Sequence, residues 1–217
     1  MWGFGLTLFF TPKSCTMPKK LHIDIETYSS VDIKSAGAYK YIESPDFEIL
    51  MIAFAIDDEP VQIIDITSHL HYNSEPTQNL LYRKFLSAYL DETVEKHAHN
   101  AVFERRAFER VGYGLPVEQW HCSAIKAGYC GYPLSLGDVS KAMGLGEFGK
   151  SSEGKALIRK FSCPAKPTKA NGMRTRNLPH LDLEAWERFK EYCMQDVVAE
   201  REITKRLEQY EISATER

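Results

Sequence analysis

The segment KKLHIDIETYSS, Lys19 to Ser30, decides how this chain folds. Aliphatic and polar residues alternate along it, the aliphatic ones being Leu21, Ile23 and Ile25. In a β-strand, alternate side chains point to opposite faces of the sheet, so Asp24 and Glu26 would share the face opposite the aliphatic residues. Two neighbouring carboxylates repel each other and resist burial. The segment therefore predicts a strand with one core face and, on the other face, two acids with a divalent metal ion between them.

Composition indicates a single globular domain. The chain has 217 residues, of which 43% are hydrophobic and 12% aromatic, enough for one sizeable core. Its formal net charge of -3 is too small to indicate a nucleic-acid or membrane partner by itself. No Cys-x-x-Cys pair occurs among the five cysteines, Cys15, Cys122, Cys130, Cys163 and Cys193. Odd in number and scattered, they predict free thiols in a reducing cytoplasm.

The start of the chain is apolar but does not have the pattern of a targeting segment. No basic region precedes the apolar run, which is far shorter than the roughly 20 residues of a membrane helix. We expect residues 1–16 to be an N-terminal extension that is neither a signal peptide nor an anchor. One domain over residues 17–210 and a tail over residues 211–217 would follow. No membrane partner is expected.

Strand and helix patterns alternate along the rest of the chain. After a connection over Thr27–Glu48, strands are predicted over Ile49–Asp57, Val61–Ile66, Val94–His99 and Trp120–Cys122. Helices are predicted over Gln78–Leu90, Ala101–Tyr113, Ser123–Tyr129, Ser135–Met143, Glu153–Phe161 and Asp182–Tyr210. Asn100 is expected to cap the helix that follows it, and Gly114 to end that helix. The last helix has an apolar stripe of Trp186, Phe189, Cys193, Val197 and Leu207. This order predicts an α/β fold.

Two further segments contain candidate functional residues. AHNAVFE places Glu104 in the first turn of a predicted helix, and EYCMQDV places Tyr192 and Asp196 four residues apart, on one helix face. Together with HIDIET, and in this order, these segments resemble the three motifs of the DEDD superfamily of 3′-to-5′ exonucleases. The wider sequence, including EGKALIRKFSCPAKPT and RTRNLPHLDLEAWERFKEYCMQDV, resembles the proofreading exonuclease domain of phage-type family A DNA polymerases. The resemblance covers most of the chain from Met17 onward.

The resemblance implies a ribonuclease-H-like fold, a mixed five-stranded sheet flanked by helices, and two bound Mg²⁺ or Mn²⁺ ions. By position, the expected metal ligands are Asp24, Glu26, Glu104 and Asp196, and the expected catalytic residues are these four acids and Tyr192. Glu104 stands where the wider family usually has aspartate. Tyr192 matches the subgroup with Tyr-x-x-x-Asp, because Glu191 occupies the position where the other subgroup has histidine. The implied activity is hydrolysis at DNA 3′ ends that releases nucleoside 5′-monophosphates.

A basic segment indicates a nucleic-acid substrate. Between Phe148 and Leu178, eight lysines and arginines accompany the single acid Glu153, in a chain that is otherwise acidic. Tyr28, Phe103 and Phe148 are expected stacking surfaces for a single-stranded or frayed DNA 3′ end. The expected substrate-binding residues are Thr27, Tyr28, Asn100, Phe103, Lys155 and Arg159.

Other interpretations are open at this stage. Ribonuclease D-like exonucleases, which trim RNA, share the Tyr-x-x-x-Asp motif, and a degenerate module would bind DNA ends without cutting them. His97, His99, His121 and Cys122 match no standard structural zinc pattern and are expected to be core or loop residues. No polymerase motif occurs in the chain, so a polymerase domain in cis or in trans is an expected partner. We expect a protein of the bacterial cytoplasm that is encoded by a phage or prophage.

Overall fold

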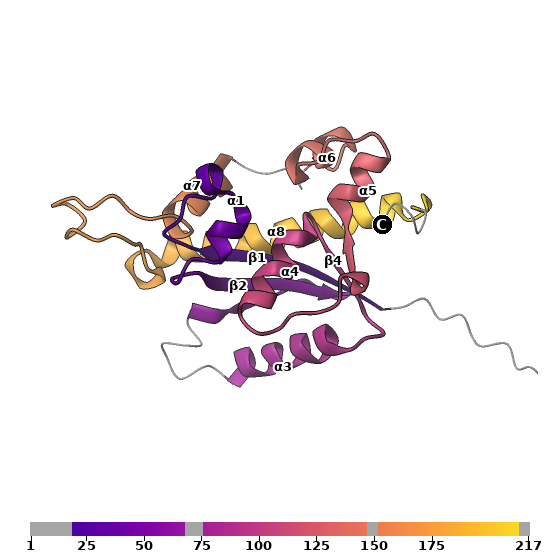
Figure 1. Cartoon of the computed structure of the whole chain (residues 1–217), viewed down its shortest axis with the longest axis horizontal. Helices are drawn as coiled ribbons and strands as arrows, with labels where there is room; N and C mark the ends of the chain where they lie inside the picture. The colour runs from indigo at the N-terminus through magenta and orange to yellow at the C-terminus, as the bar shows by residue number, and fades with distance from the viewer. Residues whose placement is uncertain (1–18, 68–75, 147–151, 213–217) are drawn as a thin grey trace, which may run out of the picture.

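A five-stranded sheet forms the centre of the computed structural model, which describes residues 19–67, 76–146 and 152–212 (Figure 1). Its strands are β1 (Lys20–Tyr28), β2 (Glu48–Ile56), β3 (Gln62–Asp65), β4 (Glu95–Ala98) and β5 (Trp120–Cys122). They lie in the order β3-β2-β1-β4-β5. The first three strands pair antiparallel, whereas β4 pairs parallel with both β1 and β5. The sheet is therefore mixed and has the predicted ribonuclease-H-like arrangement.

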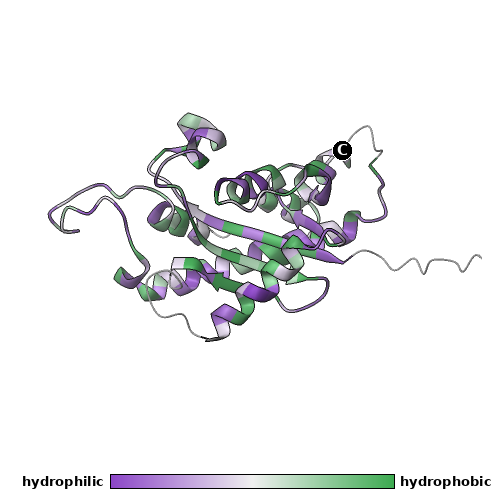
Figure 2. Ribbon diagram, turned by 60° about the horizontal axis from the view of Figure 1, so that its bottom comes forward, coloured by the Kyte–Doolittle hydropathy of each residue, from purple (hydrophilic) through white to green (hydrophobic). Residues whose placement is uncertain are grey.

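Helices cover both faces of the sheet. On one face, α3 (Pro76–Leu90) and α4 (Ala101–Arg110) share a core cluster with Leu21, Ile23 and Ile25 of β1. On the other face, α8 (Leu183–Leu207) contacts β1, β2, β3 and β4. Figure 2 shows how hydrophobic and hydrophilic residues alternate along the strands. The alternation in β1 therefore predicts correctly which side chains enter the core beneath α3 and α4.

The long helix α8 contacts both the sheet and three further helices. Its N-terminus is capped by Asp182, whose side chain accepts a hydrogen bond of 3.1 Å from the backbone N–H of Ala185. All members of the predicted apolar stripe are buried. Three further helices, α5 (Ser123–Tyr129), α6 (Leu136–Ala142) and α7 (Ser152–Phe161), pack against α8. Two short 3₁₀ helices are also described, η1 (Val117–Gln119) and η3 (Pro179–Leu181).

The predicted connection over Thr27–Glu48 is wrong in part, because it contains helix α1 (Ile33–Ile42). Asp32 caps this helix by accepting a hydrogen bond of 3.1 Å from the backbone N–H of Lys34. Gly37 has a φ of 82° and interrupts the helix. The buried residues of α1 lie only at the end of the helix. No continuous apolar stripe therefore marks it in the sequence. The Asp32 cap is the local signal that could have revealed it.

The predicted start of α4 at Ala101 is confirmed, but its predicted cap and its predicted end need correction. Asn100 precedes the helix with φ 70° and ψ 45°, and its side chain makes no capping hydrogen bond. The helix ends at Arg110 rather than Tyr113, and the left-handed glycine that follows is Gly112, with φ 92°. Asn100 therefore shapes the turn from β4 into α4 through its backbone.

Some predictions fall on residues that the structure does not describe. These are the extension over residues 1–16, the stacking residue Phe148 and most of the predicted tail. Within the described part, Cys122, Cys130, Cys163 and Cys193 are free thiols, as predicted. None of the described helices combines the length and apolarity that crossing a membrane requires.

Candidate active site

Strand β1 supplies the first two acids of the site. On its α8 face, the Cys193 thiol of α8 lies 3.3 Å from Oδ2 of Asp24. A β-bulge between Glu26 and Thr27 shifts the pairing with β2. The extra residue of this irregularity lies in β2, and both Glu26 and Thr27 line the same pocket. The hydroxyl of Thr27 is hydrogen-bonded to that of Tyr41 at 3.0 Å.

Helix α4 supplies the third acid from its first turn. Glu104 is only 5% exposed, although it is a charged residue type. Asn100 and Phe103, which precede it, line the same pocket. The ring of Phe103 is partly exposed, and its centroid lies 6.2 Å from that of Tyr41. The start of α4 therefore presents an acid, an amide and an aromatic ring to β1.

Helix α8 supplies Tyr192 and Asp196, one turn apart and both buried. The Tyr192 hydroxyl is hydrogen-bonded to Asp196. Its ring packs closely against α7, because a Cβ added to Gly154 would lie only 2.5 Å from its Cδ2 atom. The absence of a side chain at residue 154 therefore lets α7 hold the tyrosine ring in place.

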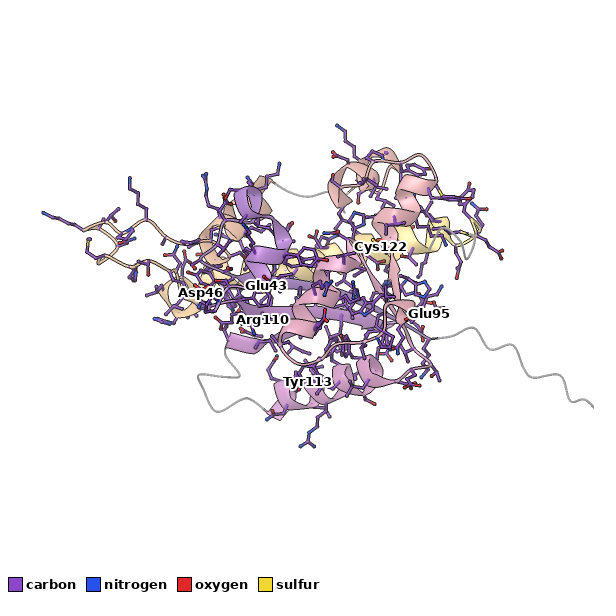
Figure 3. The ribbon with its side chains drawn as sticks, viewed as in Figure 1. Glu43, Asp46, Glu95, Arg110, Tyr113 and Cys122 are labelled. Atoms are coloured by element: carbon purple, nitrogen blue, oxygen red, sulfur yellow. The ribbon has the colours of Figure 1, made fainter. Side chains whose placement is uncertain are left out.

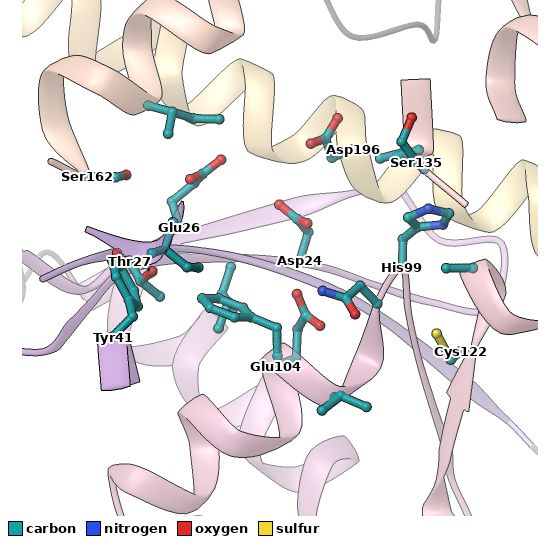
Figure 4. Close-up of a pocket in the computed structure, with 18 of the residues that line it drawn as sticks. Asp24, Glu26, Thr27, Tyr41, His99, Glu104, Cys122, Ser135, Ser162 and Asp196 are labelled. Atoms are coloured by element: carbon teal, nitrogen blue, oxygen red, sulfur yellow. Dashed lines mark hydrogen bonds between the residues drawn. The ribbon is translucent and has the colours of Figure 1, made fainter. Parts of the chain in front are cut away.

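These elements converge on one pocket of about 720 Å³ (Figure 4). Figure 4 shows Asp24 at the centre, with Asp196 above it, Glu104 below it and Glu26 to one side. Tyr192 lines the same pocket. Three segments that are far apart in the sequence therefore meet, as the motif order predicts. Three of the expected substrate-binding residues also line it, namely Thr27, Asn100 and Phe103.

The other three expected substrate-binding residues are described but do not line this pocket. Tyr28 is 5% exposed, and the Arg176 guanidinium lies 3.9 Å from its ring centroid. Its ring is therefore covered and presents no stacking surface. Lys155 and Arg159 are exposed on α7. Their spacing puts them on the same helix face as Ser162, which does line the pocket. Lys155 and Arg159 themselves lie outside the pocket.

Burial and negative charge shift the titration of several groups at the pocket. Burial, together with the charge of Asp24 and more weakly that of Glu200, raises the pKa of Glu104 well above its usual range. Burial and the neighbouring carboxylates also raise the pKa of Tyr192. The same two causes raise the pKa of the Cys193 thiol. The pocket thus concentrates negative charge in a site that water solvates poorly.

The residues present suit hard divalent cations. The four acids offer only carboxylate oxygens, which Mg²⁺ and Mn²⁺ prefer. Oε2 of Glu104 is buried and has no hydrogen-bond partner among the described residues. A nearby cation would both satisfy such an oxygen and offset the repulsion from Asp24.

Two tighter groups of potential ligands lie elsewhere on the sheet. Ligand atoms of His22, His97 and Glu200, and those of Glu95, His97 and His121, lie within 4.8 Å of one another. Neither group includes an acid of the pocket, and no other such group is found in the described ranges. Nδ1 of His22 lies 2.6 Å from Oε2 of Glu200, and Nε2 of His97 lies 3.0 Å from Oε2 of Glu95. Figure 3 labels Glu95, which belongs to the second group.

His99 and Cys122 line the pocket of the four acids, and Cys122 also lines the pocket that contains Glu95, His97 and His121. The two ring nitrogens of His99 are hydrogen-bonded to the Ser123 hydroxyl at 2.9 Å and the Leu134 carbonyl at 2.8 Å. The residues considered for a zinc site are therefore divided between two places. Sequence reasoning missed His99 as a pocket residue, and no local pattern distinguishes it.

The chain is similar to part of a phage DNA polymerase. It is 48% identical over 194 residues to the DNA polymerase of Bacillus phage SP02. The match covers 89% of this chain but 28% of that polymerase, so the chain spans less than a third of its relative's length. No family model matches the chain.

Proposed function

We propose that this chain is a metal-dependent 3′-to-5′ exonuclease that releases nucleoside 5′-monophosphates from DNA 3′ ends. One observation carries the proposal: four acids from three distant segments line a single pocket together with Tyr192. Clustered carboxylates repel one another unless cations lie between them. The set therefore suits the hydrolysis of a phosphodiester, itself an anion that needs cations in order to approach.

Two divalent ions, Mg²⁺ or Mn²⁺, are the proposed cofactors, with Asp24, Glu26, Glu104 and Asp196 as their ligands. When bound, such a pair lowers the pKa of a bound water and relieves the charge that develops on the phosphate and the leaving oxygen. The buried Oε2 of Glu104, which has no hydrogen-bond partner in the part of the chain that the structure describes, supports this assignment.

The proposed role of Tyr192 is to orient the attacking water. Its raised pKa keeps the hydroxyl protonated at neutral pH. A protonated phenol is a poor base but both donates and accepts hydrogen bonds. Its hydrogen bond to Asp196 and its close packing against Gly154 restrict its orientation.

The proposed contacts to the DNA end inside the pocket come from Thr27, Asn100 and Phe103. The partly exposed ring of Phe103 offers a surface for the terminal base, an interaction worth about 1–3 kcal/mol. The amide of Asn100 and the hydroxyl of Thr27 can hydrogen-bond to sugar or phosphate oxygens. None of these contacts reads sequence, as removal of any mispaired nucleotide requires.

The similarity to part of a phage DNA polymerase supports a role beside DNA synthesis. The proposed task is proofreading for a polymerase domain, in cis or in trans. The proposed location is the cytoplasm of a bacterial host.

Digestion of 5′-labelled single-stranded DNA in Mg²⁺ tests the proposal. The native chain is compared with Asp24→Asn and with Glu187→Gln, which removes an exposed acid of α8 that pairs with Lys190. The native chain and the Glu187 variant should give a ladder of shortened products, and Asp24→Asn should give none. Equal ladders from all three would contradict the proposed site.

The same assay separates the alternatives. A faster rate on an RNA strand of the same sequence would favour ribonuclease D-like trimming. Binding of DNA ends by the native chain without Mg²⁺-dependent turnover would favour a module that binds without cutting.

A further inference from the structure

The segment between α7 and η3 forms an arm that begins at the rim of the pocket. We call residues 163–178 the basic arm; they include four lysines and arginines and no acid. Ser162 and Cys163, at its start, line the pocket. Figure 1 shows the arm, in orange, extending away from the rest of the molecule beyond α7. The arm is thus continuous with the site but reaches outside it.

The cations of the arm are of two kinds. Arg176 anchors its base, with Nη2 2.5 Å from Oε2 of Glu48 and the guanidinium over the Tyr28 ring. The other three are exposed and form no ion pair with any residue that the structure describes; they are Lys166, Lys169 and Arg174. On α7, Lys155 and Arg159 are exposed and unpaired in the same sense. Positive charge therefore extends outward from the pocket, and no described acid forms an ion pair with these exposed side chains.

Hydrogen bonds give the arm a defined shape. The side chain of Asn171 accepts from the backbone N–H groups of Thr168 at 2.9 Å and Arg174 at 3.2 Å. The backbone N–H of Ala165 donates to the Thr175 carbonyl at 2.7 Å and closes the hairpin below this turn. A preorganised arm loses less conformational entropy when it binds. The three exposed cations are therefore presented at set positions.

We infer that the basic arm is a second nucleic-acid contact, which binds the phosphate backbone of the strand whose 3′ end occupies the pocket. The inference rests on the proposed exonuclease function. Six extended residues, Pro164 to Lys169, reach at most about 20 Å, which carries the contact several nucleotides beyond the scissile bond. Backbone contacts are independent of sequence, as the proposed function requires. The arm therefore sets affinity for long strands while the pocket performs hydrolysis.

Salt-dependent binding tests the arm without any turnover. Fluorescence anisotropy of a long fluorescein-labelled oligo(dT) is measured in EDTA over a range of KCl concentrations. The arm variant replaces Lys166, Lys169 and Arg174 by alanine. The control variant removes the same charge elsewhere, at Lys19 before β1 and at Arg83 and Lys84 on α3.

The arm variant should show a weaker dependence of log affinity on log salt concentration than the native chain. Each phosphate contact contributes about 0.7 to the dependence of log affinity on log salt for a single strand, so three lost contacts lower it by about 2. A fourfold rise in salt should then weaken the native chain about 20-fold more than the arm variant. The control should keep the native slope. Equal slopes in native chain and arm variant would overturn the inference.

Turnover distinguishes the arm from the pocket. The substrates are the same oligo(dT) and a small phosphodiester, the p-nitrophenyl ester of thymidine 5′-monophosphate. The arm variant should lose at least tenfold more kcat/KM on the long strand than on the ester. Equal losses on both would overturn the inference, because the arm would then act on the pocket itself. A native chain that cleaves neither substrate would refute the proposed exonuclease, while the salt slopes would still decide whether the arm binds DNA.

A protein partner is the competing occupant of the arm. If the arm variant kept native DNA binding but lost binding to a purified polymerase domain, the arm would be a protein interface and the inference would be wrong.

Discussion

Replacing Glu104 by glutamine should stabilise the metal-free protein while it weakens metal binding. Glu104 is 5% exposed, and its Oε2 atom has no hydrogen-bond partner among the described residues. Burial and the charge of Asp24 raise its pKa well above the usual value of 4.5. Glutamine keeps the shape of the side chain and removes the ionisable group. The variant thus separates the loss of stability caused by burying this carboxyl from its proposed role as a metal ligand.

The size of the effect depends on pH. Below the usual value of 4.5, the carboxyl is protonated in both the folded and the unfolded chain, so native and variant proteins should have similar stability. As pH rises above this value, the unfolded chain releases the proton while the folded chain keeps it, and the native protein loses stability relative to the variant. The difference stops growing once the pH passes the folded-state pKa. Each pKa unit between the unfolded and the folded chain is worth about 1.4 kcal/mol, or roughly 3 to 6 °C in melting temperature for a chain of this size.

Thermal denaturation in EDTA, followed by circular dichroism from acid to neutral pH, measures this difference. In saturating Mn²⁺ the order should reverse, because a ligand that binds only the folded state stabilises it in proportion to its affinity. The matched control is Glu109→Gln, an exposed acid of the same helix that pairs with Arg106. A Glu104→Gln variant that is less stable than the native chain in EDTA at neutral pH would refute the reasoning about burial. Equal Mn²⁺ shifts in both proteins would refute Glu104 as a ligand.

Three other changes follow from contacts at and beside the pocket. Tyr192→Phe should lower kcat about 100-fold with little change in melting temperature, because misplacing a reacting group costs that much rate; single-turnover cleavage of labelled DNA measures it. Gly154→Ala should destabilise the fold by about 1–3 kcal/mol and also reduce kcat, since the added methyl overlaps the Tyr192 ring; full activity would show that the ring needs no fixed position. His22→Ala should cost about 3–5 kcal/mol in urea denaturation, because Glu200 stays buried without its ion-pair partner. Burial opposes ionisation of Glu200, but the interaction with His22 outweighs burial and lowers the pKa of Glu200 to about 2. The stability that the pair contributes is therefore present above about pH 4.5 and is lost as pH falls toward 2. A native free energy of unfolding that stays constant over that pH window would contradict the pairing.

Sequence patterns predicted the faces of β1 and α8 because one-sided burial is a local property. The two-residue alternation in β1 separates the aliphatic side chains from Asp24 and Glu26, and the structure keeps that separation. The apolar stripe of α8 likewise identifies its buried side. The apolar pattern within each element predicts which of its faces is buried, so a single sequence is sufficient for this prediction.

Contacts between segments are not recorded in this way. Tyr28 follows Glu26 by two residues, and strict alternation would place both on the same face. Tyr28 does belong to the core cluster on that face, but Arg176 from the basic arm covers its ring. The approach of the Cys193 thiol to Asp24 depends equally on where α8 crosses the sheet. Such features need the tertiary structure, because the residues that decide them are distant in the chain.

The line of contact between β1 and α8, which we call the seam, gives a physical basis for the proposed metal requirement. Four residues advance a helix by about 6 Å, and two residues advance a strand by about 6.6 Å, so residues four apart on α8 match residues two apart on β1. Where Glu200 meets the strand, β1 supplies His22, and the pair closes at 2.6 Å. One step along, Figure 4 shows Asp196 above Asp24, so that a carboxylate faces a carboxylate. In the first step the partner of the carboxylate is an imidazole of the same chain. The second step brings two carboxylates together and gains from a cation between them. One strand position, histidine or aspartate, thus decides whether a carboxylate of α8 meets an imidazole or a second carboxylate.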